Sequence, residues 1–247
     1  MPVSKVIGII PARWGSTRFP GKALHGIAGK PLIQHVWERC VEADCFDQIV
    51  IATDDMRIAE VGFNFGAEVA ITAADHPSGT DRIAELARKL KKATIILNIQ
   101  GDEPLVDPAL LERLTRKLKD NPNIPMVTAA TPVSLEESLS EHHVKVVLDR
   151  KGDALYFSRS CIPFRRGISE VQTYKHLGIY GYRRKALLDF VRMSPGSLEQ
   201  AEQLEQLRAL ENGLKIRVVV SEINSIGVDT PEDATEVERL ILSRRSG

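Results

Sequence analysis

The 247-residue chain has no net charge at neutral pH, because 33 lysines and arginines balance 33 aspartates and glutamates. This balance disfavours a general binder of nucleic acid or anionic membranes, and no run of about 18 apolar residues predicts a membrane helix. The hydrophobic content of 43% is typical of a globular protein. The N-terminus has no signal-peptide pattern and the three cysteines form no metal or paired motif, so a cytoplasmic protein is expected.

The first half of the chain alternates between buried strands and amphipathic helices. Strands are expected from Val6 onward and at residues 48–53, 68–71, 94–99 and 126–131. Helices are expected at residues 31–43, 56–65, 81–90 and 108–120. This alternation predicts an α/β fold with a Rossmann-like, mostly parallel sheet flanked by helices.

The pattern changes after about residue 132. Strands at 145–148, 154–157 and 177–182 follow one another without long helices, which indicates a small antiparallel insertion at about 132–185. This insertion is rich in basic residues and is expected to form a flap or a dimer surface. A helix at 197–212, a strand at 216–220 and a helix at 231–243 complete the chain. No linker is evident, so a single domain over residues 1–247 is expected.

The first strand leads into a loop rich in basic residues. From Met1 to Trp37 the chain carries five basic residues and no acidic one. Arg13, Arg18 and Lys22 lie in this loop together with glycine and proline. Cations on a glycine-containing loop after a buried strand are typical of a site for a polyphosphate. For any one of these side chains, the alternative is an exposed charge that contacts only water.

Two aspartates lie next to predicted strands. Asp102 follows the strand at 94–99, and ligands of open parallel sheets bind beyond such strand ends, where the basic loop also lies. Near the last helix, Pro231 suits the first helical position, which makes Thr230 the N-cap and leaves Asp229 without a capping role. Two carboxylates that face a basic loop suit Mg²⁺ bridging a triphosphate, and a purely structural role is the alternative.

Eight motifs, in one order along the chain, resemble a known enzyme family. They are IIPARWGSTRFPGK, DHPSGTDR, NIQGDEP, VKVVLD, ALYFSR, HLGIYGYR, LEQLR and GVDTPED. Together they span residues 6–233 and resemble the 3-deoxy-manno-octulosonate cytidylyltransferases, or CMP-Kdo synthetases. The basic-loop pattern is shared by cytidylyltransferases of acidic sugars in general, whereas the combination of QGDEP, HLGIYGY and GVDTPED is more specific. The resemblance implies a nucleotide-diphospho-sugar transferase-like fold.

The resemblance also implies a reaction. CTP and 3-deoxy-manno-octulosonate (Kdo) are expected to give CMP-Kdo and diphosphate for bacterial lipopolysaccharide synthesis, with Mg²⁺ as the cofactor. The anomeric hydroxyl of the sugar attacks the α-phosphorus, and catalysis of such transfers is mostly positioning and charge neutralisation. The expected partners are therefore CTP and an acidic sugar, and the family further implies a homodimer.

Residue roles follow from the positions that match the family's motifs. The resemblance implies that Arg13, Arg18 and Lys22 hold the triphosphate, and that Ser78, Gly79, Thr80 and Arg82 face the cytosine. It implies that Asp102 and Asp229 bind Mg²⁺ and form the catalytic group with Arg13 and Lys22. The sugar carboxylate is assigned to Arg159, because guanidinium pairs bidentately with carboxylates. Candidates for the sugar hydroxyls are Gln100, His176, Tyr180, Glu205 and Gln206. The alternatives are a core aromatic residue for Tyr180, a strand-edge residue for His176 and an exposed helix face for Glu205.

Several alternatives stay open at this point. The segment between Pro163 and His176 is shorter than the family resemblance leads us to expect, and its Arg165 and Arg166 have no assigned role. Because this difference lies near the expected sugar site, the substituent at C8 of the sugar is open and 8-amino-Kdo is an alternative substrate. A sialic acid cytidylyltransferase would share the basic loop, but HLGIYGY and GVDTPED argue against it. Two alternatives of another class are a nucleotide-sugar-dependent glycosyltransferase, which should carry a DxD motif, and a non-catalytic nucleotide-binding protein.

Overall fold

The computed structural model describes residues 5–15, 19–167, 171–223 and 226–245. The chain divides into two compact units, of which the first comprises residues 1–112 and 225–247 and the second residues 113–224. Along the chain, helix α4 (Pro108–Asp120) runs from the first unit into the second. The predicted insertion at 132–185 lies within the second unit.

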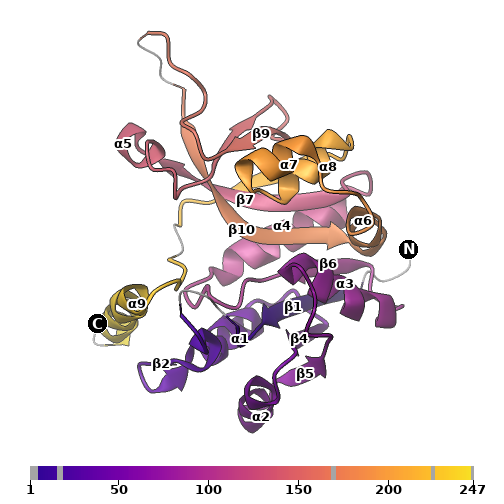
Figure 1. Ribbon diagram of the computed structural model, residues 1–247, viewed down its shortest axis with the longest axis vertical. Helices are drawn as coiled ribbons and strands as arrows, with labels where there is room; N and C mark the ends of the chain where they lie inside the picture. The colour runs from indigo at the N-terminus through magenta and orange to yellow at the C-terminus, as the bar shows by residue number, and fades with distance from the viewer. Residues whose placement is uncertain (1–4, 16–18, 168–170, 224–225, 246–247) are drawn as a thin grey trace. The chain divides into compact units, whose positions relative to one another are not determined.

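A parallel sheet forms the centre of the first unit (Figure 1). Its strands are β1 (Val6–Ala12), β4 (Gln48–Thr53), β5 (Glu68–Ile71) and β6 (Ile95–Asn98). They lie in the order β6-β1-β4-β5, and each neighbouring pair is parallel. Nearly every residue of β1 and β6 is buried, which explains why these strands read as continuous apolar runs.

Helices connect these parallel strands. They are α1 (Leu32–Glu42), α2 (Met56–Asn64) and α3 (Gly79–Lys89). A short 3-10 helix, η1 (Lys22–Leu24), and a hairpin of β2 (Gly26–Ile27) and β3 (Lys30–Pro31) lie between β1 and α1. Because β1 and β6 are neighbours and parallel, the loops that follow them emerge at the same edge of the sheet.

The last helix returns to the first unit and packs against this hairpin. Helix α9 (Pro231–Arg245) buries Val237 in one apolar cluster with Ile27 of β2. Glu238 Oε1 also accepts a hydrogen bond from the Ala28 N–H at 2.6 Å. These contacts fix the start of α9, and with it the loop that precedes the helix, beside the segment that follows β1.

The strands of the second unit run in mixed directions. They are β7 (Met126–Val133), β8 (Lys145–Leu148), β9 (Ala154–Ser158), β10 (Thr173–Arg183) and β11 (Ile216–Val220). β11 is parallel to β7, whereas the pairs β7–β10, β10–β8 and β8–β9 are antiparallel. The short helices are α5 (Leu135–Ser138), α6 (Arg184–Phe190), α7 (Ser197–Glu202) and α8 (Gln206–Glu211).

One predicted helix is wrong in its extent. Residues 197–212 form two helices instead of one, because Gln203 adopts a left-handed conformation with φ of 54°. Arg208 of α8 then donates hydrogen bonds to the Glu199 carboxylate of α7 at 2.7 and 2.5 Å. This ion pair holds the two helices together at the break. As a result Leu198 is 39% exposed, although its helical spacing predicts burial.

Other differences concern boundaries and short elements. β10 begins at Thr173, so it is longer than the predicted strand at 177–182. It also carries a bulge between Leu177 and Tyr180. α3 begins at Gly79 rather than at residue 81. The hairpin β2–β3 and helices α5 and α6 were not predicted, because elements this short carry little periodic signal.

The predicted fold class is confirmed. The first unit has the parallel, helix-flanked sheet, and the antiparallel strands follow residue 132 as expected. Cys40 lies in the core on the buried face of α1, as its spacing predicts. Within the described ranges, none of the helices is both long and apolar enough to span a bilayer.

Candidate active site

One cavity in the first unit brings together most of the residues predicted for nucleotide and metal binding. It has a volume of about 280 Å³ and lies where β1 and β6 end. The predicted residues that line it are Arg13, Lys22, Ser78, Gly79, Arg82, Gln100, Asp102 and Asp229. The expected convergence of the basic loop and the two aspartates is therefore confirmed. Arg18 lies outside the described residues.

The Lys22 ammonium group lies between the two predicted metal ligands. Its Nζ donates to Asp102 Oδ2 at 2.6 Å, to Asp229 Oδ1 at 3.1 Å and to the Val228 carbonyl oxygen at 3.0 Å. The Lys22 side chain is only 17% exposed, against 32% for Asp102 and 49% for Asp229. Oxygen atoms of two carboxylates and a carbonyl thus converge on one nitrogen, and such an arrangement is suited to hold a cation.

A capping box at the start of α9 sets the direction of Asp229. Thr230 Oγ1 accepts a hydrogen bond from the Asp233 N–H at 3.3 Å. In return, Asp233 Oδ2 accepts from the N–H groups of Thr230 at 2.8 Å and Asp229 at 2.9 Å. Pro231 is the first helical residue. The cap is therefore Thr230, as predicted, and the carboxylate of Asp229 turns to Lys22 instead.

Backbone contacts hold the loop of Asp102 against β1. A Cβ atom at Gly101 would lie 2.7 Å from the carbonyl oxygen of Pro11, so only glycine permits this close approach. The carbonyl oxygen of Asp102 also accepts a hydrogen bond from the Val228 N–H at 2.8 Å. The loops that carry Asp102 and Asp229 are thus joined to each other and to the end of β1 through main-chain atoms.

The start of α3 forms another wall of the cavity. Ser78 is its N-cap, with Oγ accepting from the Asp81 N–H at 3.1 Å, and Gly79 is the first residue of the helix. The first turn of a helix presents N–H groups and a partial positive charge, which favour a ligand that accepts hydrogen bonds. Of the four residues predicted to face the cytosine, Ser78 and Gly79 lie at this helix start, where N–H groups can donate hydrogen bonds to a ligand.

The other two residues of that predicted wall are buried. Arg82 is 4% exposed and donates to Thr72 Oγ1 at 2.5 Å, and it pairs with Asp54 at 3.2 Å. Although Arg82 lines the cavity, its guanidinium also ties the ends of β4 and β5 to α3. Thr80 is 5% exposed and is not among the residues that line the described cavity.

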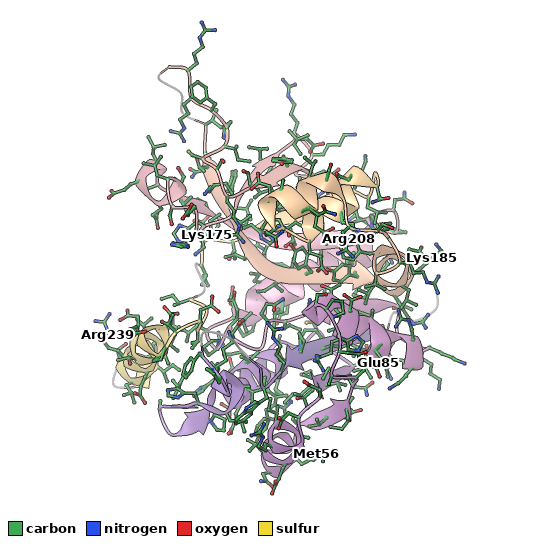
Figure 2. All side chains as sticks on the ribbon, viewed as in Figure 1. Met56, Glu85, Lys175, Lys185, Arg208 and Arg239 are labelled. Carbon is green, nitrogen blue, oxygen red and sulfur yellow. The ribbon has the colours of Figure 1, made fainter. Side chains whose placement is uncertain are left out.

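His76 lines the cavity although the motif analysis gave it no role. Its Nε2 lies 2.7 Å from Glu85 Oε2 on α3 (Figure 2 labels Glu85). Glu85 also accepts from Lys89 Nζ at 2.6 Å and from the Ala73 N–H at 2.9 Å. The hydrogen bond from Lys89, followed by those from Ala73 and His76, lowers the pKa of Glu85 to about 2. The position of His76 two residues before Ser78 could have indicated its place.

Three of the predicted sugar-binding residues are neighbours in the second unit. The ring centroids of His176 and Tyr180 on β10 are 5.3 Å apart, and Thr128 Oγ1 lies 2.9 Å from His176 Nε2. Burial lowers the pKa of His176 to about 3, so the ring is neutral near pH 7. Burial, followed by the nearby Tyr182 and Glu205, raises the pKa of Tyr180. Both side chains are therefore uncharged hydrogen-bonding groups at neutral pH.

Arg159 and Gln206 have different surroundings in that unit. Arg159 is exposed, and its guanidinium donates to the carbonyl oxygens of Glu202 at 3.1 Å and Glu141 at 3.4 Å. Gln206 is 6% exposed and begins α8. The structure thus holds Arg159 at the surface of the unit and places Gln206 in its interior.

The fold is shared with known nucleotidyltransferases. Residues 7–216 match the family described as cytidylyltransferase. A 4-diphosphocytidyl-2C-methyl-D-erythritol synthase from Anaerococcus prevotii has the same fold, with a TM-score of 0.64 at 15% identity over 97% of this chain and 99% of that one. The chain is therefore a nucleotidyltransferase of the cytidylyltransferase class.

More similar relatives define the family within this class. The 3-deoxy-manno-octulosonate cytidylyltransferase of Geobacter metallireducens is 50% identical over 94% of this chain and 96% of that protein. That of Syntrophobacter fumaroxidans is 52% identical over 94% of this chain and 95% of that protein. A solved CMP:2-keto-3-deoxy-manno-octonic acid synthetase complexed with CTP has a TM-score of 0.95 at 41% identity, over 98% of this chain and 100% of that one. The chain belongs to the 3-deoxy-manno-octulosonate cytidylyltransferase family.

The low pKa of Glu85 predicts a pH-dependent contribution to stability. A carboxyl group whose pKa falls from 4.5 to about 2 on folding stabilises the fold above pH 4.5 and loses this effect as the pH falls toward 2. We expect Glu85→Gln to lower the free energy of unfolding by about 1–2 kcal/mol at pH 7. In urea titrations from pH 7 to pH 3, this difference should shrink below pH 4.5.

The matched control is Glu60→Gln on the exposed face of α2, which should change stability little at any of these pH values. A loss in Glu85→Gln that stays constant down to pH 3 would show that the carboxylate charge does not stabilise this part of the site.

Proposed function

We propose that this protein joins CTP to Kdo, giving CMP-Kdo and diphosphate for lipopolysaccharide synthesis. The observation that carries the proposal is the cavity in which Arg13 and Lys22 meet Asp102 and Asp229 at the ends of β1 and β6. It is supported by the names of the relatives, and by the neighbour whose structure holds CTP.

The nucleotide is proposed to bind along the walls of this cavity. Arg13 and Lys22 would neutralise phosphate oxygens, because charge-assisted hydrogen bonds from cations are strong and directional. The first turn of α3, with Ser78 and Gly79, would present hydrogen-bond donors to the base or the ribose. Gln100 lines the same cavity and is proposed to contact the sugar there.

Mg²⁺ is proposed as the cofactor, held by Asp102 and Asp229. The donor set fits this ion, because their carboxylate oxygens already converge on one cationic nitrogen, that of Lys22. Mg²⁺ usually takes one or two carboxylates together with phosphate and water oxygens. When bound, it would supply positive charge that stabilises the phosphate oxygens during the transfer.

The chain's own residues would position the reactants. The anomeric hydroxyl oxygen forms a bond to the α-phosphorus while the bond from that phosphorus to the bridging oxygen breaks, and diphosphate leaves with the bonding electrons. The hydroxyl proton passes to a nearby carboxylate or to water. Arg13 and Lys22 would stabilise the charge that develops on the leaving diphosphate, which is the main requirement in such transfers.

The acidic sugar requires groups that are not occupied by phosphate. Arg159 is proposed for the sugar carboxylate, since its exposed guanidinium donates to the carbonyl oxygens of Glu202 and Glu141 and forms no ion pair within the described residues. Neutral His176 and Tyr180, with the half-buried Glu205, are proposed for the hydroxyls. Gln206 is proposed to support this group from the interior of the unit.

We further propose a homodimer in the cytoplasm. Large apolar side chains are exposed in the second unit, among them Leu139 at 68% and Phe164 at 88%, and a second copy of the chain would cover such side chains. The three cysteines, all within the described residues, do not form disulfides, as is usual in a reducing compartment. Sedimentation of the purified protein at micromolar concentration should give twice the chain mass of 27.4 kDa. A single 27.4 kDa species would contradict the dimer.

The reaction is tested by measuring diphosphate release from CTP and Mg²⁺ with Kdo, 8-amino-Kdo or sialic acid. Kdo should give the highest kcat/KM, and release with sialic acid alone would overturn the proposal.

Asp102→Asn should lower turnover by about a thousandfold or more while the fold persists, because a metal ligand and a Lys22 partner are lost together. Near-normal turnover in this variant would remove Asp102 from the metal site.

The metal site is tested separately by the stability of Lys22→Met. With the ammonium gone, the carboxylates of Asp102 and Asp229 repel each other, which should lower the unfolding midpoint by about 2–4 °C in EDTA. Millimolar Mg²⁺ or Mn²⁺ should restore this loss by taking the place of the ammonium. Lys30→Met is the matched control, since Lys30 pairs with only one carboxylate, that of Glu38.

The control should show no recovery with either metal ion. If divalent ions fail to raise the midpoint of Lys22→Met above that of the control, then the two aspartates do not form a cation site.

A further inference from the structure

A stacked tryptophan lies at the base of the basic loop. The Arg57 guanidinium carbon lies 3.4 Å from the ring centroid of Trp14, which is within the range of a cation–π interaction. The same indole covers Gly21, where an added Cβ would meet ring atoms of Trp14 at 3.0 and 3.1 Å. Trp14 therefore contacts both Arg57 of α2 and Gly21 at the far end of the loop.

Arg57 is itself fixed by Asp55. Its Nε and a terminal nitrogen donate to the two carboxylate oxygens of Asp55 at 2.9 and 2.6 Å, which forms a bidentate fork. Asp55 is the N-cap of α2 and also accepts from the Arg57 N–H at 2.9 Å. The hydrogen bonds from Arg57 lower the pKa of Asp55, so the carboxylate stays ionised near neutral pH.

The stack leads directly to Lys22. The Gly21 N–H donates to the Trp14 carbonyl oxygen at 3.1 Å, which closes the loop on itself. Gly21 has φ of 71°, a conformation that favours glycine, and it is the N-cap of η1, whose first residue is Lys22. A continuous set of contacts thus runs from Asp55 and Arg57 through Trp14 and Gly21 to the lysine between the two aspartates.

We propose that Arg57, held by Asp55, is a positioning residue that acts through Trp14 to hold together the two ends of the basic loop, next to Arg13 and Lys22. Arg57 and Trp14 are not among the described residues that line the cavity, so the proposal places their effect on the loop. Fixing the two ends of a loop lowers the entropy that binding must remove, so the effect should fall on the affinity for the triphosphate. The identification of the bound triphosphate as CTP rests on the proposed function.

The kinetic test compares Arg57→Ala with Arg239→Ala. Arg239 projects from α9 (Figure 2) and forms the same kind of exposed bidentate fork, with Glu236 at 3.1 and 2.6 Å. Arg57→Ala should raise the KM for CTP by about three- to tenfold, with kcat within twofold and the KM for the sugar unchanged. Arg239→Ala should change none of these constants.

Graded variants separate positioning from general damage to the fold. Asn at position 55 can still cap α2, so Asp55→Asn should keep the helix but weaken the fork, and it should raise the KM for CTP by a smaller factor. Arg57→Lys keeps a cation over the ring without the fork and should give a similarly intermediate value. A KM for CTP that is unchanged in Arg57→Ala would overturn the inference.

A spectroscopic test does not depend on activity. The chain has two tryptophans, so Trp37→Phe leaves Trp14 as the only one. In this background, Arg57→Ala should raise the acrylamide quenching constant of Trp14 by about twofold, because the indole loses its cover, whereas Arg239→Ala should not. Unchanged quenching would overturn the inference even if the enzyme is active. A wild-type protein that does not turn over CTP would instead contradict the proposed function. The quenching measurement would still test whether Arg57 covers the Trp14 ring.

Discussion

The site depends on one ammonium group that three distant segments share. Lys22 meets Asp102 across 80 residues of sequence and Asp229 across 207. Bringing these groups together requires that β1 and β6 end, and that α9 begins, at one place. The attraction between an ammonium and two carboxylates cannot achieve this alone, because such pairs at partly exposed positions contribute little to stability.

The arrangement of Lys22, Asp102 and Asp229 comes instead from backbone and packing contacts around these three charged groups. The absence of a side chain at Gly101 lets the Asp102 loop approach β1, and the capping box at Thr230 turns Asp229 away from the helix. Glu238 fixes α9 to the hairpin that follows Lys22. Each of these contacts is local and specific, so the charged groups are held in place before any binding energy is used.

The regular elements of the first unit could be predicted because burial on both faces of a parallel sheet leaves a strong apolar pattern. The capping role of Thr230 was also predictable, since Pro231 and Asp233 lie at fixed positions next to it. The break at Gln203 was not, because its left-handed backbone is held by an ion pair between Arg208 and Glu199, and neither residue marks a helix end. Local sequence patterns predict those features of the structure that are stabilised by contacts between residues close in sequence. The contact of Trp14 with Arg57 joins residues 43 positions apart and left no signal of this kind.

The charges of the cavity explain why a divalent cation belongs with the nucleotide in the proposed reaction. Among the described residues that line the cavity, Arg82 is paired with Asp54, so the remaining charges of Arg13 and Lys22 are balanced by those of Asp102 and Asp229. A cavity without net charge has little general attraction for a triphosphate, although it contains the right donors. In the proposed reaction, a cation that arrived with the phosphates would change this balance, because it would neutralise the two carboxylates and the Lys22 ammonium could then contact phosphate oxygens. Lys22 thus balances the charges of Asp102 and Asp229 in this structure, and under the proposed function its transfer to the phosphate oxygens would couple nucleotide binding to assembly of the reactive site.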